Sequence, residues 1–338
     1  MDERLHRRGM TRRRAITVIA AFAGLPLPAV AARPDLFANT GAAVTFTDGI
    51  VTWHGQALGA PAQLILHHED EDTARRLVGR IVAEAARLEA IFSLYRDASA
   101  LSELNRTGVL AAPPGELVAL LRQCRDFHAV SGGAFDPTVQ PLWRLYSRHF
   151  AMTRSDPGGP SATALAAART LVGFEMVRFN RDRVAFARPG VAMTLNGIAQ
   201  GFVTDRAVDM MKQAGMTSSL VDMGEIRAVG SRADGAPWRV GLARTGDTAP
   251  DKIIELTEAA VATSSAAGFH FDTSGRFSHL LDPRSGAAAA RYARMSVIAP
   301  DATTADALST AFSLMEPDAV RAITATRPGI AADFVLSS

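Results

Sequence analysis

The sequence has little that could cross-link the chain or hold it in a membrane. Its 338 residues include one cysteine, Cys124, so no internal disulfide can form. Cys124 lies among leucines at helical spacing, which favours a buried structural thiol. Beyond residue 32, no stretch reaches the ~18 uninterrupted apolar residues that a membrane-spanning helix needs. With 48% hydrophobic and 21% charged residues, the composition is that of an ordinary globular domain.

The body of the chain also lacks an excess of positive charge. The formal net charge is +2. Six arginines within residues 1–31 outnumber Asp2 and Glu3, which gives this segment a net charge of +4 and leaves about −2 for the remainder. The pI of about 9.0 therefore reflects the N-terminal segment alone. No basic surface for nucleic acid is predicted.

Residues 1–32 have the pattern of a signal peptide. Arginines at positions 12–14 precede an apolar run that ends near Val30, and residues 29–32 offer an A-x-A cleavage site. The paired arginines predict export by the twin-arginine route to the periplasm. An uncleaved membrane anchor is the alternative, which Pro26 and Pro28 disfavour because they end the apolar run early. We expect residues 33–338 to form a single domain with no stable membrane insertion after cleavage.

The stretch Thr194–Gly201, with the sequence TLNGIAQG, is the centre of the pattern. An apolar segment of strand character over residues 184–193 precedes it, and helical periodicity over residues 202–214 follows it. A strand, turn and helix in this order leave unpaired N–H groups at the helix start, which suits an anion such as a phosphate. Gly197 and Gly201 would let a ligand approach the backbone. A plain connection with small residues for packing is the alternative.

A second pattern lies near the C-terminus, in a helix predicted over residues 304–315 and capped by Thr303 or Thr304. Asp306 falls in its first turn, and Thr310 lies one turn further on the same face. A carboxylate and a hydroxyl are hard oxygen ligands that suit Mg²⁺. Taken alone, the pair is more readily explained by capping or packing. It gains weight only if the glycine-rich turn supplies phosphate groups opposite.

Three further segments carry polar or aromatic groups in predicted loops. His279 leaves a strand into a Pro-Gly turn, where it could act as a base, although a surface or core histidine is the alternative. Residues 92–96 and 132–137 offer aromatic rings beside polar groups, which can stack on a flat heterocycle or merely pack.

The remaining periodicity predicts the fold class. Residues 52–66 read as a hairpin, residues 72–92 and 116–130 as helices, and residues 219–229 as one strand. Helices and strands are mixed without a regular βαβ period, so the predicted class is α+β.

Six short motifs occur in an order that resembles the ApbE family of FAD:protein FMN transferases, from about Trp53 to Met315. They are Phe92-Ser93-Leu94-Tyr95-Arg96-Asp97, Leu104-Asn105, Gly133-Ala134-Phe135-Asp136-Pro137-Thr138, Asn196-Gly197-Ile198-Ala199-Gln200-Gly201 with Asp205-Arg206-Ala207, His279-Leu280-Leu281-Asp282-Pro283-Arg284-Ser285-Gly286, and Ala305-Asp306-Ala307-Leu308-Ser309-Thr310. The resemblance implies an α+β, ApbE-like (T-fold-like) domain of mixed sheets and helices, with the active site in a cleft between two lobes.

The resemblance also implies site residues. The Gly197 carbonyl and the side chains of Asp306 and Thr310 would bind Mg²⁺, and His279 and Asp306 would be the catalytic residues. The expected FAD contacts are Leu58, Tyr95, Ala134, Phe135, Asp136, Thr194, Gln200 and Leu281. At two of these positions the chain departs from the usual pattern, because Thr194 replaces an Asp and Gln200 replaces a Lys or Glu.

The implied reaction is Mg²⁺-dependent transfer of FMN from FAD to a Thr or Ser hydroxyl of a partner protein, with release of AMP. The turn and the segment Val221–Arg227 resemble the NosX branch of the family, which implies a NosR-like membrane protein of nitrous oxide respiration as the acceptor. Hydrolysis of FAD to FMN and AMP, and a non-catalytic periplasmic FAD carrier, are the alternatives.

Overall fold

The structure is a computed structural model that describes residues 43–47, 49–247 and 249–337. The predicted signal peptide, residues 1–32, lies outside this part of the chain. Within the described ranges, no helix is both long enough and apolar enough to cross a membrane.

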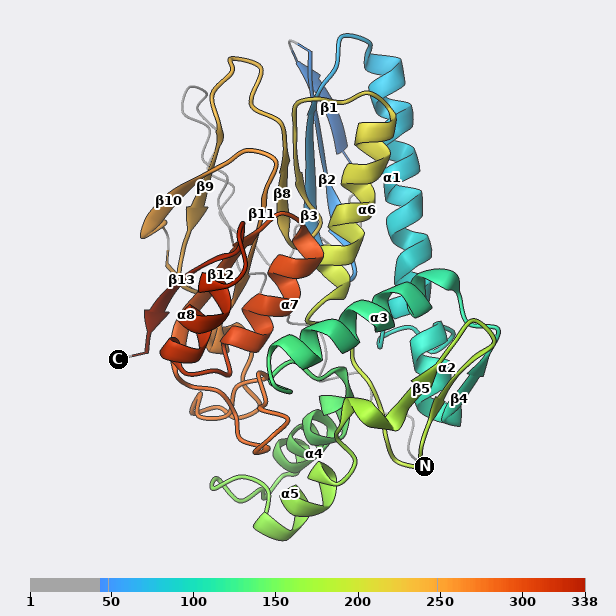
Figure 1. Ribbon diagram of the computed structural model, residues 1–338, viewed down its shortest axis with the longest axis vertical. Coiled ribbons are helices and arrows are strands. Elements are labelled where there is room, and N and C mark those ends of the chain that lie inside the picture. The colour runs from blue at the N-terminus through green and yellow to red at the C-terminus, as the bar shows by residue number, and fades with distance from the viewer. Residues whose placement is uncertain (1–42, 48, 248, 338) are drawn as a thin grey trace.

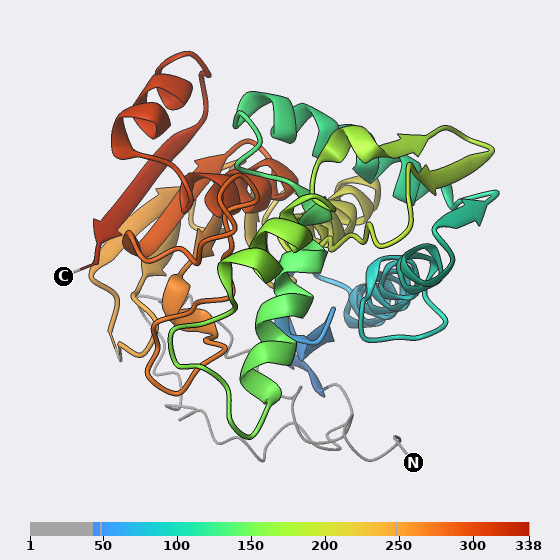
Figure 2. The same cartoon turned by 90° about the horizontal axis from the view of Figure 1, so that it is seen from below.

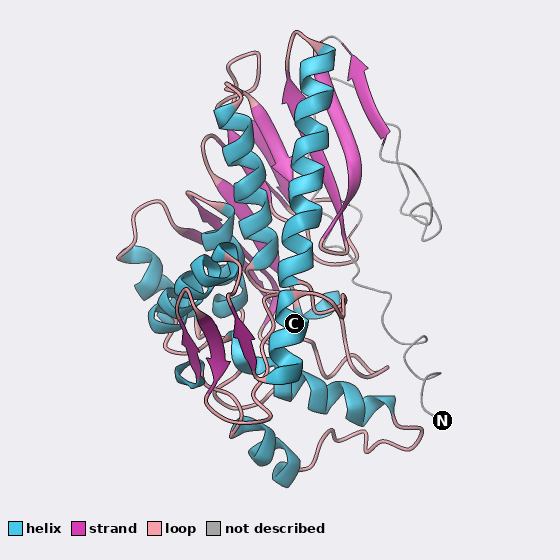
Figure 3. Ribbon diagram, turned by 90° about the vertical axis from the view of Figure 1, so that its right-hand side faces the viewer, coloured by secondary structure: helices cyan, strands magenta, loops and turns pink. Residues whose placement is uncertain are grey.

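The largest element is an eight-stranded, fully antiparallel sheet (Figure 1). Its strands, in spatial order, are β1 (Ala43–Thr47), β2 (Ile50–Ala57), β3 (Ala60–His67), β7 (Ser219–Asp222), β8 (Ile226–Val229), β11 (Ala260–Ser264), β12 (Tyr292–Ala299) and β13 (Ala331–Leu336). Three helices cover one face: α1 (Glu71–Phe92), α6 (Ala199–Gln213) and α7 (Ala302–Phe312) (Figure 3). The α+β class predicted from the sequence is confirmed.

The other face of the sheet is covered by a two-stranded sheet of β9 (Trp238–Leu242) and β10 (Lys252–Leu256). Strand alternation divides β3 between the two faces. Leu64 and Leu66 join the helix-side core, whereas Ile65 packs with Val240 and Leu242 on the opposite side. The sheet is therefore buried on both faces over its central strands.

A smaller sheet of β4 (Val109–Ala111), β6 (Arg183–Phe186) and β5 (Val177–Phe179) lies beside the helices α2 (Ala100–Thr107) and α3 (Gly115–Val130). The remaining helices are α4 (Gln140–Ala151), α5 (Ala162–Arg169) and α8 (Pro317–Ala325). Helices α4 and α5 lie at the lower end in Figure 1 and are drawn in green in Figure 2, the view from below. On α3, Cys124 is completely buried as predicted, and its burial raises the pKa of the thiol.

Two strand predictions are wrong. Residues 219–229 form the two strands β7 and β8, joined by a turn in which Gly224 has a φ of 106°. Strand character before the glycine-rich turn ends at Phe186 with β6, and Pro189-Gly190 follows. Residues 191–195 are buried or half-buried but pair with no strand. Polar contacts with other segments therefore fix their position.

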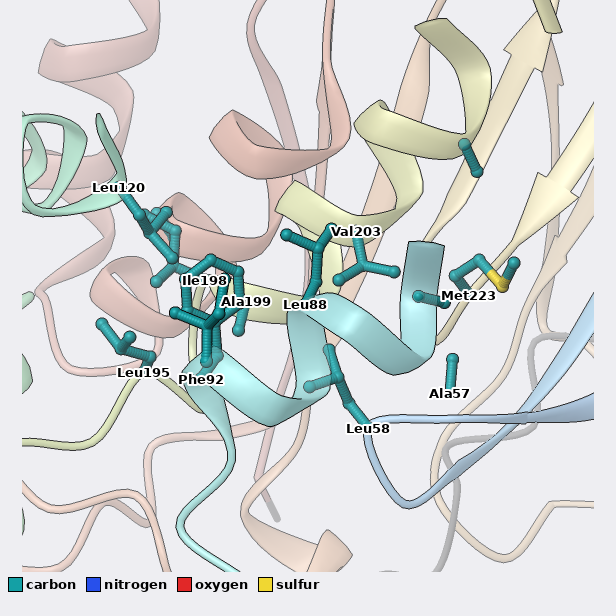
Figure 4. Close-up of a cluster of buried hydrophobic side chains, with 14 of the residues drawn as sticks. Ala57, Leu58, Leu88, Phe92, Leu120, Leu195, Ile198, Ala199, Val203 and Met223 are labelled. Carbon is teal, nitrogen blue, oxygen red and sulfur yellow. The ribbon is translucent and has the colours of Figure 1, made fainter. Parts of the chain in front are cut away.

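The predicted hairpin is confirmed as β2 and β3, and its turn contributes to the core at the start of α6. Leu58 occupies this turn with a φ of 51°, a conformation that is costly for a branched side chain. Figure 4 shows Leu58 close to Leu88 of α1, with Phe92 beside Ile198 and Ala199. Because Leu88 is fully buried, its truncation to alanine would cost about 2–5 kcal/mol. This core fixes the first turn of α6 against α1.

Candidate functional site

A pocket opens where the β2–β3 turn, the end of α1 and the start of α6 meet. It is lined by Leu58, Phe92, Ser93, Tyr95, Asn196, Ala199 and Gln200. Tyr95 lies at the rim with 49% of its surface exposed, and its N–H donates to Ser93 Oγ at 3.0 Å. The structure thus brings together three of the residues expected to contact FAD, namely Leu58, Tyr95 and Gln200.

The chain that enters the glycine-rich turn is held by hydrogen bonds from two other segments. The Asn105 side chain on α2 bonds both backbone groups of Met193, at 2.7 and 2.8 Å. The Thr194 N–H donates to the Pro137 carbonyl at 2.8 Å, and Thr194 Oγ1 accepts from the Asn196 N–H at 3.2 Å. Asn105 had no predicted role, because its partner is a backbone segment 88 residues away.

The glycine-rich turn lies directly against α7. A Cβ on Gly197 would lie 2.8 Å from Thr310 Oγ1, and a Cβ on Gly201 would lie only 2.3 Å from the Ala302 carbonyl oxygen. The Gly201 N–H donates to Asp306 Oδ2 at 3.0 Å, and Asp306 is 4% exposed. The two glycines permit a close approach between segments more than a hundred residues apart. The structure thus places Gly197 against Thr310 and Gly201 against Asp306.

The start of α7 differs from the prediction. Its N-cap is Asp301, which accepts from the Thr304 N–H at 2.7 Å, so the predicted cap at Thr303 or Thr304 is wrong. A carboxylate in extended backbone before the helix takes the capping position. Asp306 therefore lies in the second turn, where its carboxylate faces Gly201 rather than the helix start.

The donors at this contact fit a hard divalent cation. In the described ranges, no three His, Cys, Asp or Glu side chains gather as metal ligands. The oxygens present are instead a backbone carbonyl, one carboxylate and one hydroxyl. Gly201 lies in the first turn of α6, where amides have no partner within the helix, and its N–H goes to Asp306 and not to the Gly197 carbonyl. No other donor in the described part of the chain takes that carbonyl, which leaves it available as a ligand.

His279 lies half-buried in the loop between β11 and β12. Its Nδ1 lies 3.1 Å from the Phe269 carbonyl, which also accepts the His279 backbone N–H at 3.0 Å. Because a carbonyl can only accept, the neutral ring carries its proton on Nδ1 and its basic lone pair on Nε2. Leu281, two residues on, is buried against Leu142 and Tyr146. Neither His279 nor Leu281 lines the pocket.

The segment Ala134-Phe135-Asp136 is also buried away from the pocket. Asp136 accepts hydrogen bonds from the N–H and the hydroxyl of Thr138 and from the Phe174 N–H. Its other neighbour is His128 Nδ1, at 3.4 Å. Burial raises the pKa of the Asp136 carboxyl, although the bonds from Thr138 act in the opposite direction. These side chains therefore hold the fold.

A carboxylate with no predicted role lies beneath the pocket. Asp222 ends β7 and accepts the Gly224 N–H at 2.9 Å, and burial raises its pKa to about 6. A Cβ on Gly224 would lie 2.3 Å from Gln200 Nε2, so the side chain of Gln200 rests on this turn. The β7–β8 turn therefore supports one wall of the pocket.

Comparisons with known proteins agree on one family. The profile of the ApbE family matches residues 58–334. The FAD:protein FMN transferase of Haemophilus influenzae is 28% identical over 244 residues, which cover 68% of this chain and 70% of that protein. The FAD:protein FMN transferase of Treponema pallidum is 30% identical over 269 residues, or 73% of each chain.

Solved structures give the same result. The apo form of the flavinyl transferase ApbE from Pseudomonas stutzeri superposes with a TM-score of 0.75 at 31% identity, over 87% of this chain and 93% of that one. The ApbE protein of Thermotoga maritima also superposes with a TM-score of 0.75, at 27% identity, over 85% of this chain and 94% of its own.

Proposed function

The chain belongs to the ApbE family, and from this premise we propose that it is an FAD:protein FMN transferase that works at the contact between α6 and α7. Its FAD would lie in the pocket, with the diphosphate against the turn at Gly197–Gly201. Mg²⁺ would be bound by the Gly197 carbonyl, Asp306 and Thr310. When bound, such an ion neutralises charge on phosphoryl oxygens and on the leaving group.

The observation that carries the proposal is the convergence of oxygen donors at this contact. A Cβ on Gly197 would touch Thr310, and Gly201 donates to Asp306. The buried Asp306 carboxylate, the Thr310 hydroxyl and the Gly197 carbonyl, which accepts no hydrogen bond from the described residues, would make a set of hard oxygen ligands. A flavin carrier would not need this set at the diphosphate.

The reaction requires one proton acceptor. The hydroxyl oxygen of a Thr or Ser on the acceptor protein forms a new bond to the phosphorus on the FMN side of FAD, and the bond from that phosphorus to the AMP oxygen breaks. AMP leaves with the electron pair, and the hydroxyl proton goes to Nε2 of His279. His279 does not line the pocket, so it would meet the acceptor hydroxyl outside it. Positioning and electrostatics supply most of the acceleration.

One experiment separates transfer from its two alternatives. The chain from residue 33 is incubated with FAD, Mg²⁺ and an acceptor fragment, and the acceptor is weighed by mass spectrometry. A gain of one FMN residue together with free AMP supports transfer. Free AMP with unmodified acceptor would mean FAD hydrolysis, and intact bound FAD would mean a carrier.

The finer proposals concern branch, partner and location. The resemblance of TLNGIAQG and of Val221–Arg227 to the NosX branch supports a NosR-like acceptor, and Arg12 and Arg13 support export to the periplasm. In the mass assay, a NosR-like fragment should gain FMN and unrelated Thr-bearing fragments should not. Replacing both arginines with lysine should retain the protein in the cytoplasm. Export of that variant at the normal rate would contradict the twin-arginine route.

A further inference from the structure

Helices α6 and α7 run antiparallel, and their contacts occur at three levels (Figure 1). Gly197 meets Thr310, and Gly201 meets Asp306. At the third level, Asp205 meets the residues Ala302 and Thr303. Each step is four residues on α6 and about four on α7, which is one helical turn on both. The first two levels carry the oxygen atoms that would bind the metal. The third level, at Asp205, lies one turn further along α6 and is not part of the proposed metal site.

The third level is a dense set of hydrogen bonds to one carboxylate. Asp205 Oδ1 accepts the Ala302 N–H at 2.8 Å, and Oδ2 accepts the Thr303 N–H at 2.8 Å and the Thr303 hydroxyl at 2.5 Å. Arg227 of β8 donates to Oδ1 at 2.6 Å. The side chain of Asp205 is 16% exposed and that of Arg227 15%. One carboxylate thus joins α6, the first turn of α7 and the main sheet.

We propose that Asp205 is a positioning residue that sets the register of α7 on α6, so that Asp306 and Thr310 lie opposite the Gly197 carbonyl. Two of the amides at the start of α7 have no partner within their own helix. The Asp205 carboxylate accepts hydrogen bonds from both of these amides, and it can do so only where Ala302 lies beside it. A slip of α7 by one residue would break these bonds and rotate Asp306 away from Gly201 by about 100°.

A capping carboxylate also stabilises a helix in the ordinary way, and the chain provides a matched control for that effect. Asp301 caps the same helix end by accepting from Thr304 N–H, but it belongs to the segment that leads into α7. Asp301→Ala should therefore lower helix stability without freeing α7 from α6. Asp205→Ala removes the bonds between the helices.

The test uses two measurements on the wild type, Asp205→Ala and Asp301→Ala. The first is hydrogen exchange of the Gly201 amide in the protein without ligands, because this amide is held by Asp306 across the contact. The second is the affinity for Mn²⁺ in the presence of FAD, measured by electron paramagnetic resonance without turnover. We expect Asp205→Ala to speed the exchange and to weaken Mn²⁺ binding by about tenfold each. Asp301→Ala should change either value by less than about threefold.

Equal effects of the two variants on exchange would overturn the proposal. If Asp205→Ala does not fold, Asp205→Asn keeps an oxygen acceptor and should lie between the wild type and the expected loss. The inference rests on the metal site of the proposed function, and the readouts separate their failures. If Asp205→Ala speeds the exchange as expected but the wild type fails to bind Mn²⁺, the metal role is refuted for both this inference and the proposed function. Normal Mn²⁺ binding without modification of the acceptor would refute only the transfer.

Discussion

The contact between α6 and α7 and the aromatic region around α4 are built in opposite ways. At α6–α7 the partners are glycines, a carboxylate, a hydroxyl and backbone groups, placed so that an added Cβ would meet another atom at 2.8 Å or less. Around α4, large rings fill the space: Trp143, Tyr146 and Phe150 of the helix meet Phe269, Phe271 and Phe277 of the loop before β12. The first region has no room for a side chain on its two glycines, whereas the second depends on ring volume.

This difference predicts separate consequences of substitution. Changes at α6–α7 should alter the position of the oxygen donors and hence metal-dependent chemistry. Changes around α4 should alter the free energy of unfolding alone, although Phe269 links that region to His279, with ring centroids 6.3 Å apart. Substitutions in each region show whether the two are separate.

The largest effect is expected for Asp306→Asn, which keeps the shape and one oxygen but removes the charge. Transfer of FMN should fall by about 10²–10³-fold, because charge stabilisation at the phosphoryl group depends on the bound cation. The rate is measured at saturating FAD over a range of Mg²⁺ concentrations. An unchanged rate at every concentration would remove Asp306 from the metal site.

Gly201→Ala should cost about 3 kcal/mol of unfolding free energy, since its Cβ would lie 2.3 Å from a backbone carbonyl that cannot move aside cheaply. Gly79 on α1 is the control, because a Cβ there would meet nothing within 4 Å. Gly79→Ala should stabilise the protein by about 0.5–1 kcal/mol. Urea denaturation gives both values. Destabilisation of similar size in both variants would show that helix propensity, and not the close contact, governs Gly201.

Asp222→Asn tests whether the ionised carboxylate of Asp222, beside the pocket, lowers the free energy of unfolding. The pKa of about 6 in the folded protein lies above the ordinary value, so stability from this group is complete below about pH 4 and is lost as the pH rises through 6. Asparagine cannot ionise. The variant should therefore be more stable than the wild type by about 1–2 kcal/mol at pH 8, after allowance for partial exposure. A difference that does not depend on pH would rule out this account of Asp222.

The smallest effect is expected in the aromatic region. Tyr146→Phe removes the hydrogen bond from the hydroxyl to the Gly286 carbonyl, which is 3.0 Å long, and should cost about 1 kcal/mol of unfolding free energy. The Mg²⁺ dependence of transfer should not change. If it does change, the two regions are coupled and the comparison above fails.

The sequence predicted those parts of the site that follow from spacing along the chain. Asp306 and Thr310, four residues apart, share one face of α7, and Gly201 and Gly197 lie against these two residues. Asp205 was noted only as part of a motif, because its partners are backbone amides about a hundred residues away and have no signature in the sequence. The position of His279 outside the pocket likewise depends on the path of a long loop.

The errors in the fold have a similar origin. The turn between β7 and β8 was missed because Met223 continues the apolar pattern and only Gly224 marks the break. The cap of α7 was assigned two or three residues too late because Thr303 and Thr304 follow Asp301 closely, and capping depends on backbone geometry as well as residue type.

The central claim is that α6 and α7 together form a binding site for a divalent cation. Crystals of the protein with FAD and Mn²⁺ test it directly through anomalous diffraction. The account predicts one peak bounded by the Gly197 carbonyl, Asp306 and Thr310, at about 2.0–2.2 Å from each oxygen. A cation bound to the FAD diphosphate but away from all three residues would contradict it.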